Sequence, residues 1–271
     1  MPGSIIAETT RPGQIIQFTE DDHRYVIKNK ATGEELKELI SCTTLIGQYY
    51  EAFDAEKVSL RKARQKLKIA DDGLPPSQAV LECAEEFKRE WAGASTYGTR
   101  VHEYMEDLIK DRPPRNQPQD ERERLVFEYG AAFVRRIKSR LYGFESEKIV
   151  CDYDWGIAGT VDLIARDPKA DHLIMMDWKT NKKIDLDTYI NKYCYPPVDH
   201  IPDCEFGHYS LQLNLYEAML KHAGYYPKEI KFLKYLIHLH KDKGVTVIQV
   251  PDRQREVHDL VNDHLSKINA R

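Results

Sequence analysis

Several features that define common protein classes are scarce or missing in this sequence. Its five cysteines are scattered without a Cys-x-x-Cys pair, which argues against a disulfide framework and against a zinc ribbon. No apolar run approaches the roughly 20 residues of a membrane helix. No Gly-x-x-x-x-Gly-Lys-Ser/Thr phosphate loop is present, so the sequence shows no nucleotide-driven motor. The net charge of −4 lacks the basic excess of a non-specific nucleic-acid binder, so such binding must be local.

What the sequence does contain fits one sizeable globular unit. Hydrophobic residues make up 41% of the 271 positions and can build a core, while 31% charged residues favour solubility. The first residues, Met1 to Ser4, show neither a signal-peptide core nor an Arg-rich transit pattern. We therefore expect a soluble, intracellular protein that does not associate with a membrane.

The spacing of apolar residues changes twice along the chain. Residues 1–50 predict a small β-rich annex, with strands between 14 and 46. From about 52 to 140 the pattern is helical, with breaks at 72–76 and 111–114 that suggest roughly four helices. Strands then return, which predicts an α/β fold with a central mixed sheet flanked by helices over 51–271. The expected later elements are strands at 147–151, 157–165 and 173–179, a helix near 205–222, strands at 230–239 and 244–250, and a helix from Asp252.

Two consecutive strands of this expected sheet carry charged residues. Asp162 follows Gly159 in one strand, and Asp177 and Lys179 end the next. Because side chains alternate along a strand, Asp177 and Lys179 point to one face and Trp178 to the other. Unpaired charges are costly to bury in apolar surroundings, and ion pairing or a divalent cation is the usual remedy. The pattern predicts a metal site with a lysine beside it.

Three further motifs are ambiguous when each is taken alone. His102 comes four residues after Gly98 near the start of an expected helix, and isolated histidines of this kind are more often structural. Glu145 and Glu147 share a face of the strand before Asp162. Gln212 and Tyr216 share a helix face among apolar residues, where a buried amide needs a hydrogen-bond partner.

Together, and in this order, the motifs resemble the PD-(D/E)XK nuclease superfamily, and within it the RecB-like branch with the mitochondrial genome maintenance exonuclease group and phage exonucleases. The resemblance implies a restriction-endonuclease-like core over about residues 95–220. It rests on a motif order of Gly-x-x-x-His (Gly98 to His102), a strand glutamate (Glu147), Gly-x-x-Asp (Gly159 to Asp162), Asp-x-Lys (Asp177 to Lys179) and Gln-x-x-x-Tyr (Gln212 to Tyr216).

The resemblance also implies roles for these residues. Asp162 and Asp177 would be the central metal ligands, completed by the backbone carbonyl of Trp178, with His102 as an added ligand and Glu147 as a nearby carboxylate. Lys179 would position or activate the attacking water. The expected cofactor is Mg²⁺ or Mn²⁺, since an imidazole suits the softer Mn²⁺. The choice of Glu147 over Glu145 rests on spacing to Gly159.

Substrate contacts follow from the same resemblance. Gln212 and Tyr216 would orient the active-site face and contact the nucleic-acid backbone. The basic stretch from Lys57 to Lys68 places Arg61, Arg64 and Lys68 on one helix face, which would contact phosphates if the nuclease site lies nearby. A solvated helix face is the simpler interpretation of that stretch. Asp152 and Asp154 also compete for the site by their position in the sequence.

Three functions compete at this stage. The favoured one is a metal-dependent DNA exonuclease that acts on free ends, in particular of single-stranded DNA, in replication, repair or recombination. A structure-specific or RNA-directed endonuclease on the same fold is the alternative, because a helical arch from residues 52–140 could decide how ends are recognised. The third is a non-catalytic nucleic-acid-binding module, although intact Asp162, Asp177 and Lys179 argue against it.

The sequence also leads to expectations about binding partners, cellular compartment and an iron–sulfur cluster. The partners would be DNA and replication or recombination proteins, and the compartment would be the cytoplasm of a bacterium or of a phage-infected cell. Iron–sulfur members of the branch carry a cysteine triplet after the nuclease core. Nothing after Cys204 supplies such a triplet, so no iron–sulfur cluster is expected.

Overall fold

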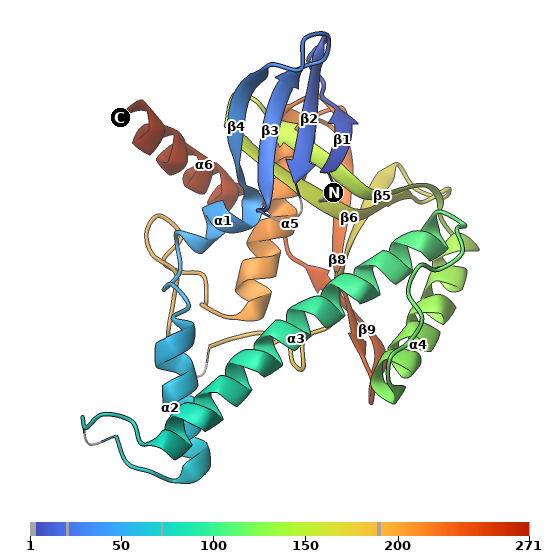
Figure 1. Ribbon diagram of the computed structural model, residues 1–271. Coiled ribbons are helices and arrows are strands. Elements are labelled where there is room, and N and C mark those ends of the chain that lie inside the picture. Colours follow the sequence, from blue (N-terminus) through green and yellow to red (C-terminus); the bar gives the residue numbers. More distant parts are fainter. Residues whose placement is uncertain (1–3, 20–21, 72, 189–190, 271) are drawn as a thin grey trace.

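The computed structural model describes residues 4–19, 22–71, 73–188 and 191–270. Within these ranges a nine-stranded sheet extends through the molecule, in the order β1-β2-β3-β4-β6-β7-β8-β9, with β5 paired to β6 outside this path (Figure 1). The β4–β6 and β7–β8 pairs are parallel and the others are antiparallel. The strands are β1 Ser4–Glu8, β2 Gln14–Thr19, β3 Arg24–Asn29, β4 Glu35–Ser41, β5 Tyr142–Asp152, β6 Ile157–Arg166, β7 His172–Lys179, β8 Lys231–His240 and β9 Gly244–Val250.

Helices cover both faces of this sheet, which confirms the predicted α/β class with a mixed sheet. On one face α1, α5 and α6 form the largest core cluster with β6, β7 and β8. On the other face α3 and α4 pack against apolar side chains of the same three strands, including Trp178. The helices are α1 Cys42–Gly47, α2 Ala55–Leu67, α3 Gln78–Ile109, α4 Glu121–Lys138, α5 Glu205–His222 and α6 Gln254–Asn269.

Most of the later elements lie where the sequence pattern predicts them, and three differences stand out. The span from 52 to 140 contains three helices, not roughly four, because α3 continues unbroken for 32 residues through Gly93 and Gly98. The short elements β1 and α1 were not predicted.

In the described ranges, none of the helices is both long and apolar enough to cross a lipid bilayer.

The N-terminal strands join the sheet through β4. Ile40 and Ser41 pair in parallel with Ile157 and Ala158 of β6, so the hairpins of β1 to β4 continue the central sheet. The helix N-cap at Ser41 ends β4 and starts α1, because its side-chain oxygen accepts a hydrogen bond from the backbone N–H of Thr44. The annex therefore places Cys42 at the edge of β6, close to Gly159.

Gly159 is the point where β6 and α5 come closest. A Cβ atom on this residue would lie 2.6 Å from Cε1 of Tyr216 and 3.2 Å from the sulfur of Cys42. The buried ring of Tyr216 thus occupies the space above the strand that any side chain here would need. The glycine of the Gly-x-x-Asp motif and the tyrosine of the Gln-x-x-x-Tyr motif are two parts of one packing contact.

We expect Gly159→Ala to lower the free energy of unfolding by about 1–3 kcal/mol, because the added methyl overpacks a site closed by a ring and a thiol. Urea denaturation measures the change. Gly93→Ala is the matched control, since nothing lies within 4 Å of a Cβ at that helical position and alanine there should stabilise by about 0.5–1 kcal/mol. Equal stability of Gly159→Ala and the wild type would refute the contact.

Candidate active site

The candidate site opens at an interruption in one edge of β6. Strand β5 pairs with β6 along its whole length, from Asp152–Ile157 to Tyr142–Arg166, so β4 and β7 must share the other edge. Strand β4 pairs only at 157–158 and β7 only at 163–166. Residues 159–162 of β6, which contain Gly159 and Asp162, therefore lie in the gap between the two partners.

Asp162 bridges this gap with its side chain. The backbone N–H of Trp178 donates to Asp162 Oδ2 at 2.8 Å, although Asp162 and Asp177 are no longer paired in the ladder. The Asp177 carboxylate, 3% exposed, lies in an ion pair with Lys179, at 2.5 Å from Oδ2 to Nζ. As predicted from alternation, Trp178 points away, into the core beneath α3 and α4.

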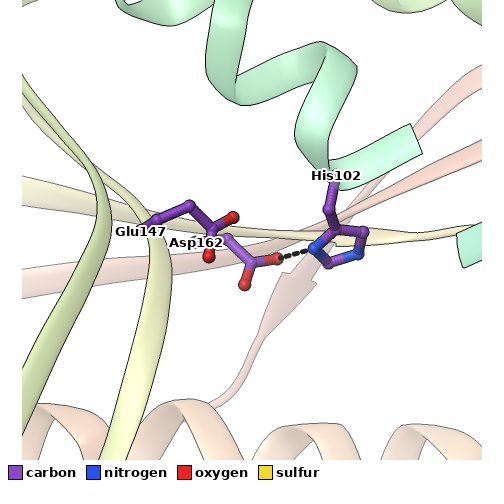
Figure 2. A group of neighbouring side chains, drawn as sticks. All are labelled: His102, Glu147 and Asp162. Atoms are coloured by element: carbon purple, nitrogen blue, oxygen red, sulfur yellow. Dashed lines mark ion pairs between the residues drawn. The ribbon is translucent and has the colours of Figure 1, made fainter. Parts of the chain in front are cut away.

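His102 reaches the site from α3. Its Nε2 donates to the carbonyl oxygen of Trp178 at 2.9 Å, and its Nδ1 lies 3.4 Å from Asp162 Oδ2. Figure 2 shows the imidazole facing the Asp162 carboxylate, with Glu147 on the neighbouring strand. The histidine therefore links the two strands that separate at this point.

Packing and an ion pair fix the rotation of α3 that brings His102 to the sheet. Val101 and Met105, both 0% exposed, pack into the core between α3, α4 and the sheet. One residue before the histidine, the Arg100 guanidinium donates to both carboxylate oxygens of Glu123 on α4, at 2.7 and 3.0 Å. A bidentate pair of this kind is directional as well as stabilising.

Glu147 completes the cluster from β5. Its neighbours Ser146 and Lys148 pair with Leu163 and Val161, which places Glu147 across from Asp162. Its backbone is left-handed, with φ of 51°, a conformation that non-glycine residues rarely adopt and that often accompanies function. One ligand atom each from His102, Glu147 and Asp162 lies within 4.8 Å of the others.

The other acidic residues that compete by sequence lie elsewhere. Glu145 is held by Lys148 at 2.5 Å and by the hydroxyl of Tyr226. Asp152 pairs with His222, and Asp154 pairs with Arg11 at 2.6 Å. Each of these carboxylates is engaged by a partner outside the cluster, so the structure places Glu147, and not Glu145, in the cluster with Asp162.

The carboxylates of Glu147, Asp162 and Asp177 lie close together in surroundings that are largely shielded from water. Burial, then the charges of Asp162 and Glu106, raises the pKa of Glu147 well above its usual value. Burial likewise raises the pKa of Asp177 to about 6, against the opposing effect of Lys179. Burial lowers the pKa of Lys179, but the attraction of Asp177 and Asp162 outweighs it and the pKa is raised, so the amine stays protonated.

These residues fit a divalent cation. Glu147 Oε1 is buried and has no hydrogen-bond partner among the described residues, as expected of an oxygen that would ligate an ion. Asp162, Asp177 and Glu147 supply carboxylate oxygens, and His102 adds a nitrogen, which suits Mn²⁺ as well as Mg²⁺.

Gln212 and Tyr216 lie on α5 and are bonded to each other. Gln212 Nε2 donates to the Tyr216 hydroxyl at 3.0 Å, and Tyr216 is 4% exposed against Gly159. The expected contact between Tyr216 and a nucleic-acid backbone is not available to a ring buried in this way. Of the two predicted roles, the placement supports orientation of the active-site face.

Tyr209, also on α5, is a site residue that sequence reasoning missed. Lys179 Nζ lies 4.2 Å from the centroid of its ring, and its hydroxyl donates to Asn181 Oδ1 at 3.0 Å. It precedes Gln212 by one helical turn, so the only sequence signal was a shared helix face with a known motif. The Lys179 ammonium is therefore held by two contacts, a cation–π contact with the Tyr209 ring and the ion pair with Asp177.

The basic residues of α2 lie apart from the cluster. In Figure 1, α2 packs beside the first half of α3, away from β5 and β6. Arg64 pairs with Asp71 and donates to the carbonyl oxygen of Leu74 at 2.9 Å, whereas Lys68 caps the helix in a left-handed conformation. Arg61 is exposed. The structure therefore does not bring Arg61, Arg64 and Lys68 together with the candidate site.

Residues 76–271 match the family model of the PD-(D/E)XK nuclease superfamily. The chain belongs to this superfamily. All the candidate site residues except those on α2 lie inside the matched range. Nucleases of the PD-(D/E)XK superfamily are metal-dependent phosphodiesterases that act on nucleic acid, so this chemistry is assigned to the chain.

A solved structure of a candidate exonuclease from Eubacterium rectale superposes with a TM-score of 0.42 and 13% identity, covering 85% of this chain and 79% of its own. No curated protein sequence matches this chain. The family assignment therefore rests on the family match.

We expect Glu147→Gln to abolish metal binding while it stabilises the metal-free protein by about 1 kcal/mol, because it removes one of several repelling charges. Thermal melts with and without Mn²⁺ measure both effects. A metal at 100 times its Kd should stabilise the wild type by about 2.7 kcal/mol. Glu145→Gln is the matched control and should keep the full metal effect. The assignment fails if Glu145→Gln loses the metal response and Glu147→Gln keeps it.

Proposed function

We propose that this PD-(D/E)XK nuclease is a metal-dependent exodeoxyribonuclease of the RecB-like type, which hydrolyses single-stranded DNA from free ends in replication, repair or recombination. The observation that carries the proposal is the cluster itself. His102, Glu147 and Asp162 converge within 4.8 Å, beside the Asp177–Lys179 ion pair. The sequence likeness to the RecB-like exonucleases supports action on ends.

The residues divide the work of phosphodiester hydrolysis. A bound Mg²⁺ or Mn²⁺ would supply charge neutralisation on the phosphate and a nucleophilic water, held by Asp162, Asp177, Glu147, His102 and the Trp178 carbonyl. Lys179 remains an ammonium, as its raised pKa indicates. It therefore orients the attacking water and balances the negative charge that builds on the phosphate, and it does not act as a neutral base.

A non-catalytic binding module is a poor account of the same cluster. Buried carboxylates that repel one another cost stability, and Asp177 and Glu147 both have raised pKa values. A protein that only bound nucleic acid would gain from replacing them with neutral side chains. An endonuclease on the same site remains the alternative that the substrate test below separates.

We expect the wild type with Mg²⁺ or Mn²⁺ to degrade linear single strands and to leave circular single strands intact. Asp177→Asn and Lys179→Met should each lower the cleavage rate by about 10²–10³-fold, because each removes charge stabilisation at the reacting phosphate. End-labelled DNA on denaturing gels measures the rates. The control Asp171→Asn changes an exposed carboxylate in the turn before β7 and should retain wild-type activity. Cleavage of circles would instead establish an endonuclease.

Tyr209 offers a separate test of how Lys179 is held. Tyr209→Phe keeps the ring next to the ammonium and should retain activity within about threefold, whereas Tyr209→Leu should lose about 3- to 30-fold, which matches a cation–π contact of about 0.5–2 kcal/mol. Steady-state cleavage of a linear strand measures both variants. If Phe and Leu prove equally active, the ring does not position the lysine.

A further inference from the structure

A second cleft lies immediately beside the candidate active site. It has a volume of about 440 Å³ and is lined by Tyr97, Arg122, Thr180, Lys182, His240 and Lys241, together with Glu90 and Leu239. Thr180 and Lys182 follow directly after Lys179. Across from them, a Cβ on Gly98 of α3 would lie 3.4 Å from Thr180 Oγ1, so α3 and the segment after β7 form adjoining walls of both sites.

The cleft is positively charged in a chain whose net charge is −4. Three permanent cations, Arg122, Lys182 and Lys241, line it with one carboxylate, Glu90. Glu90 pairs with Lys182. In the part of the chain that the structure describes, no carboxylate forms an ion pair with Arg122 or Lys241. The cleft thus keeps two cations available for an anionic ligand.

Arg122 is held in place for such a ligand. Its guanidinium carbon lies 3.9 Å from the centroid of the Tyr97 ring, and the group also hydrogen-bonds to the Tyr97 side chain, so the ring holds the guanidinium at the wall of the cleft. The nearby carboxylate Glu123 is engaged by Arg100 at 2.7 Å. A planar, preoriented guanidinium matches the paired oxygens of a phosphate.

The separation between the two sites suits a nucleic-acid strand. Tyr97 precedes His102 by five residues on α3, a distance of about 7.5 Å along the helix axis at 1.5 Å per residue. Successive phosphates of one strand are spaced by at least ~3.4 Å along their axis. For a strand that runs along α3, an axial separation of this size corresponds to about one or two nucleotides.

We propose that this cleft binds a phosphate group of the substrate strand, one or two nucleotides from the scissile bond, through Arg122 and Lys241. The proposal rests on the proposed nuclease function, because it names the group that the same substrate presents next to the cut. Phosphate could come from the strand interior as a diester or from a strand end as a monoester. Both sources share the chemistry that the two cations recognise.

The test is strand binding by the full chain without divalent metal, so that cleavage does not interfere. We expect the double variant Arg122→Gln, Lys241→Gln to bind single-stranded DNA about tenfold more weakly, with a slope of log K against log salt that is smaller by about 0.7–1.4. The matched control, Arg136→Gln with Lys243→Gln, removes the same charge from exposed positions on α4 and the β8–β9 turn and should bind like the wild type.

The strand ends distinguish the two phosphate sources. An equal loss on circular, hydroxyl-ended and phosphorylated strands assigns the cleft to an internal diester, whereas a loss confined to strands with a 5′- or 3′-phosphate assigns it to a terminal monoester. Identical affinity and salt slope for the double variant and the wild type overturn the proposal, as does an equal loss in the control. Cleavage by the wild type in a parallel assay with Mn²⁺ shows that the nuclease function stands even then.

Discussion

The structure depends on one costly arrangement, which is a group of carboxylates held together where two strands separate. Asp162 and Asp177 would face each other as the next pair of the β6–β7 ladder, but that ladder ends at Leu163 and Met176. Glu147 approaches from the other neighbouring strand. Desolvation and mutual repulsion raise the pKa values of Glu147 and Asp177. A divalent cation relieves this repulsion, so the fold is built around a site that a metal would complete.

The surrounding elements keep this arrangement from relaxing. The ring of Tyr216 fills the space above Gly159, and the side chain of Asp162 replaces a ladder bond by accepting from the N–H of Trp178. From α3, the His102 side chain donates a hydrogen bond to the carbonyl oxygen of Trp178. The Trp178 ring is anchored in the core on the opposite face. The separation of the two strands, the positions of the candidate metal ligands and the packing of the core therefore depend on one another. The neighbouring basic cleft shares walls with this site.

The sequence could predict features that depend on short-range periodicity. Alternation along β7 put Asp177 and Lys179 on one face and Trp178 on the other, and the bounds of β6, β7, α5, β8 and β9 followed from apolar runs and turns. The extra helix expected between 52 and 140 was wrong, because the two predicted breaks separate only three helices and the stretch between the breaks is one continuous helix of 32 residues, α3. Short elements such as β1 and α1 carry too few residues for a periodic signal.

Features that depend on distant contacts could not be predicted from residues alone. His102 is placed at the site by its contact with the Trp178 carbonyl, 76 positions away. Only the resemblance to a family predicted a role for this histidine. Alternation treats Glu145 and Glu147 alike, and the left-handed backbone at Glu147 is what separates them. Arg64 looked free in a run without acids, but the chain folds back and pairs it with Asp71.

The most direct test of the account is to locate Mn²⁺ by its anomalous scattering in crystals of the wild type grown with the ion. The account predicts a peak within coordination distance of the Asp162 and Asp177 carboxylates, bordered by Glu147, His102 and the Trp178 carbonyl oxygen. A fully occupied Mn²⁺ peak at another place, with this cluster still metal-free, would contradict it.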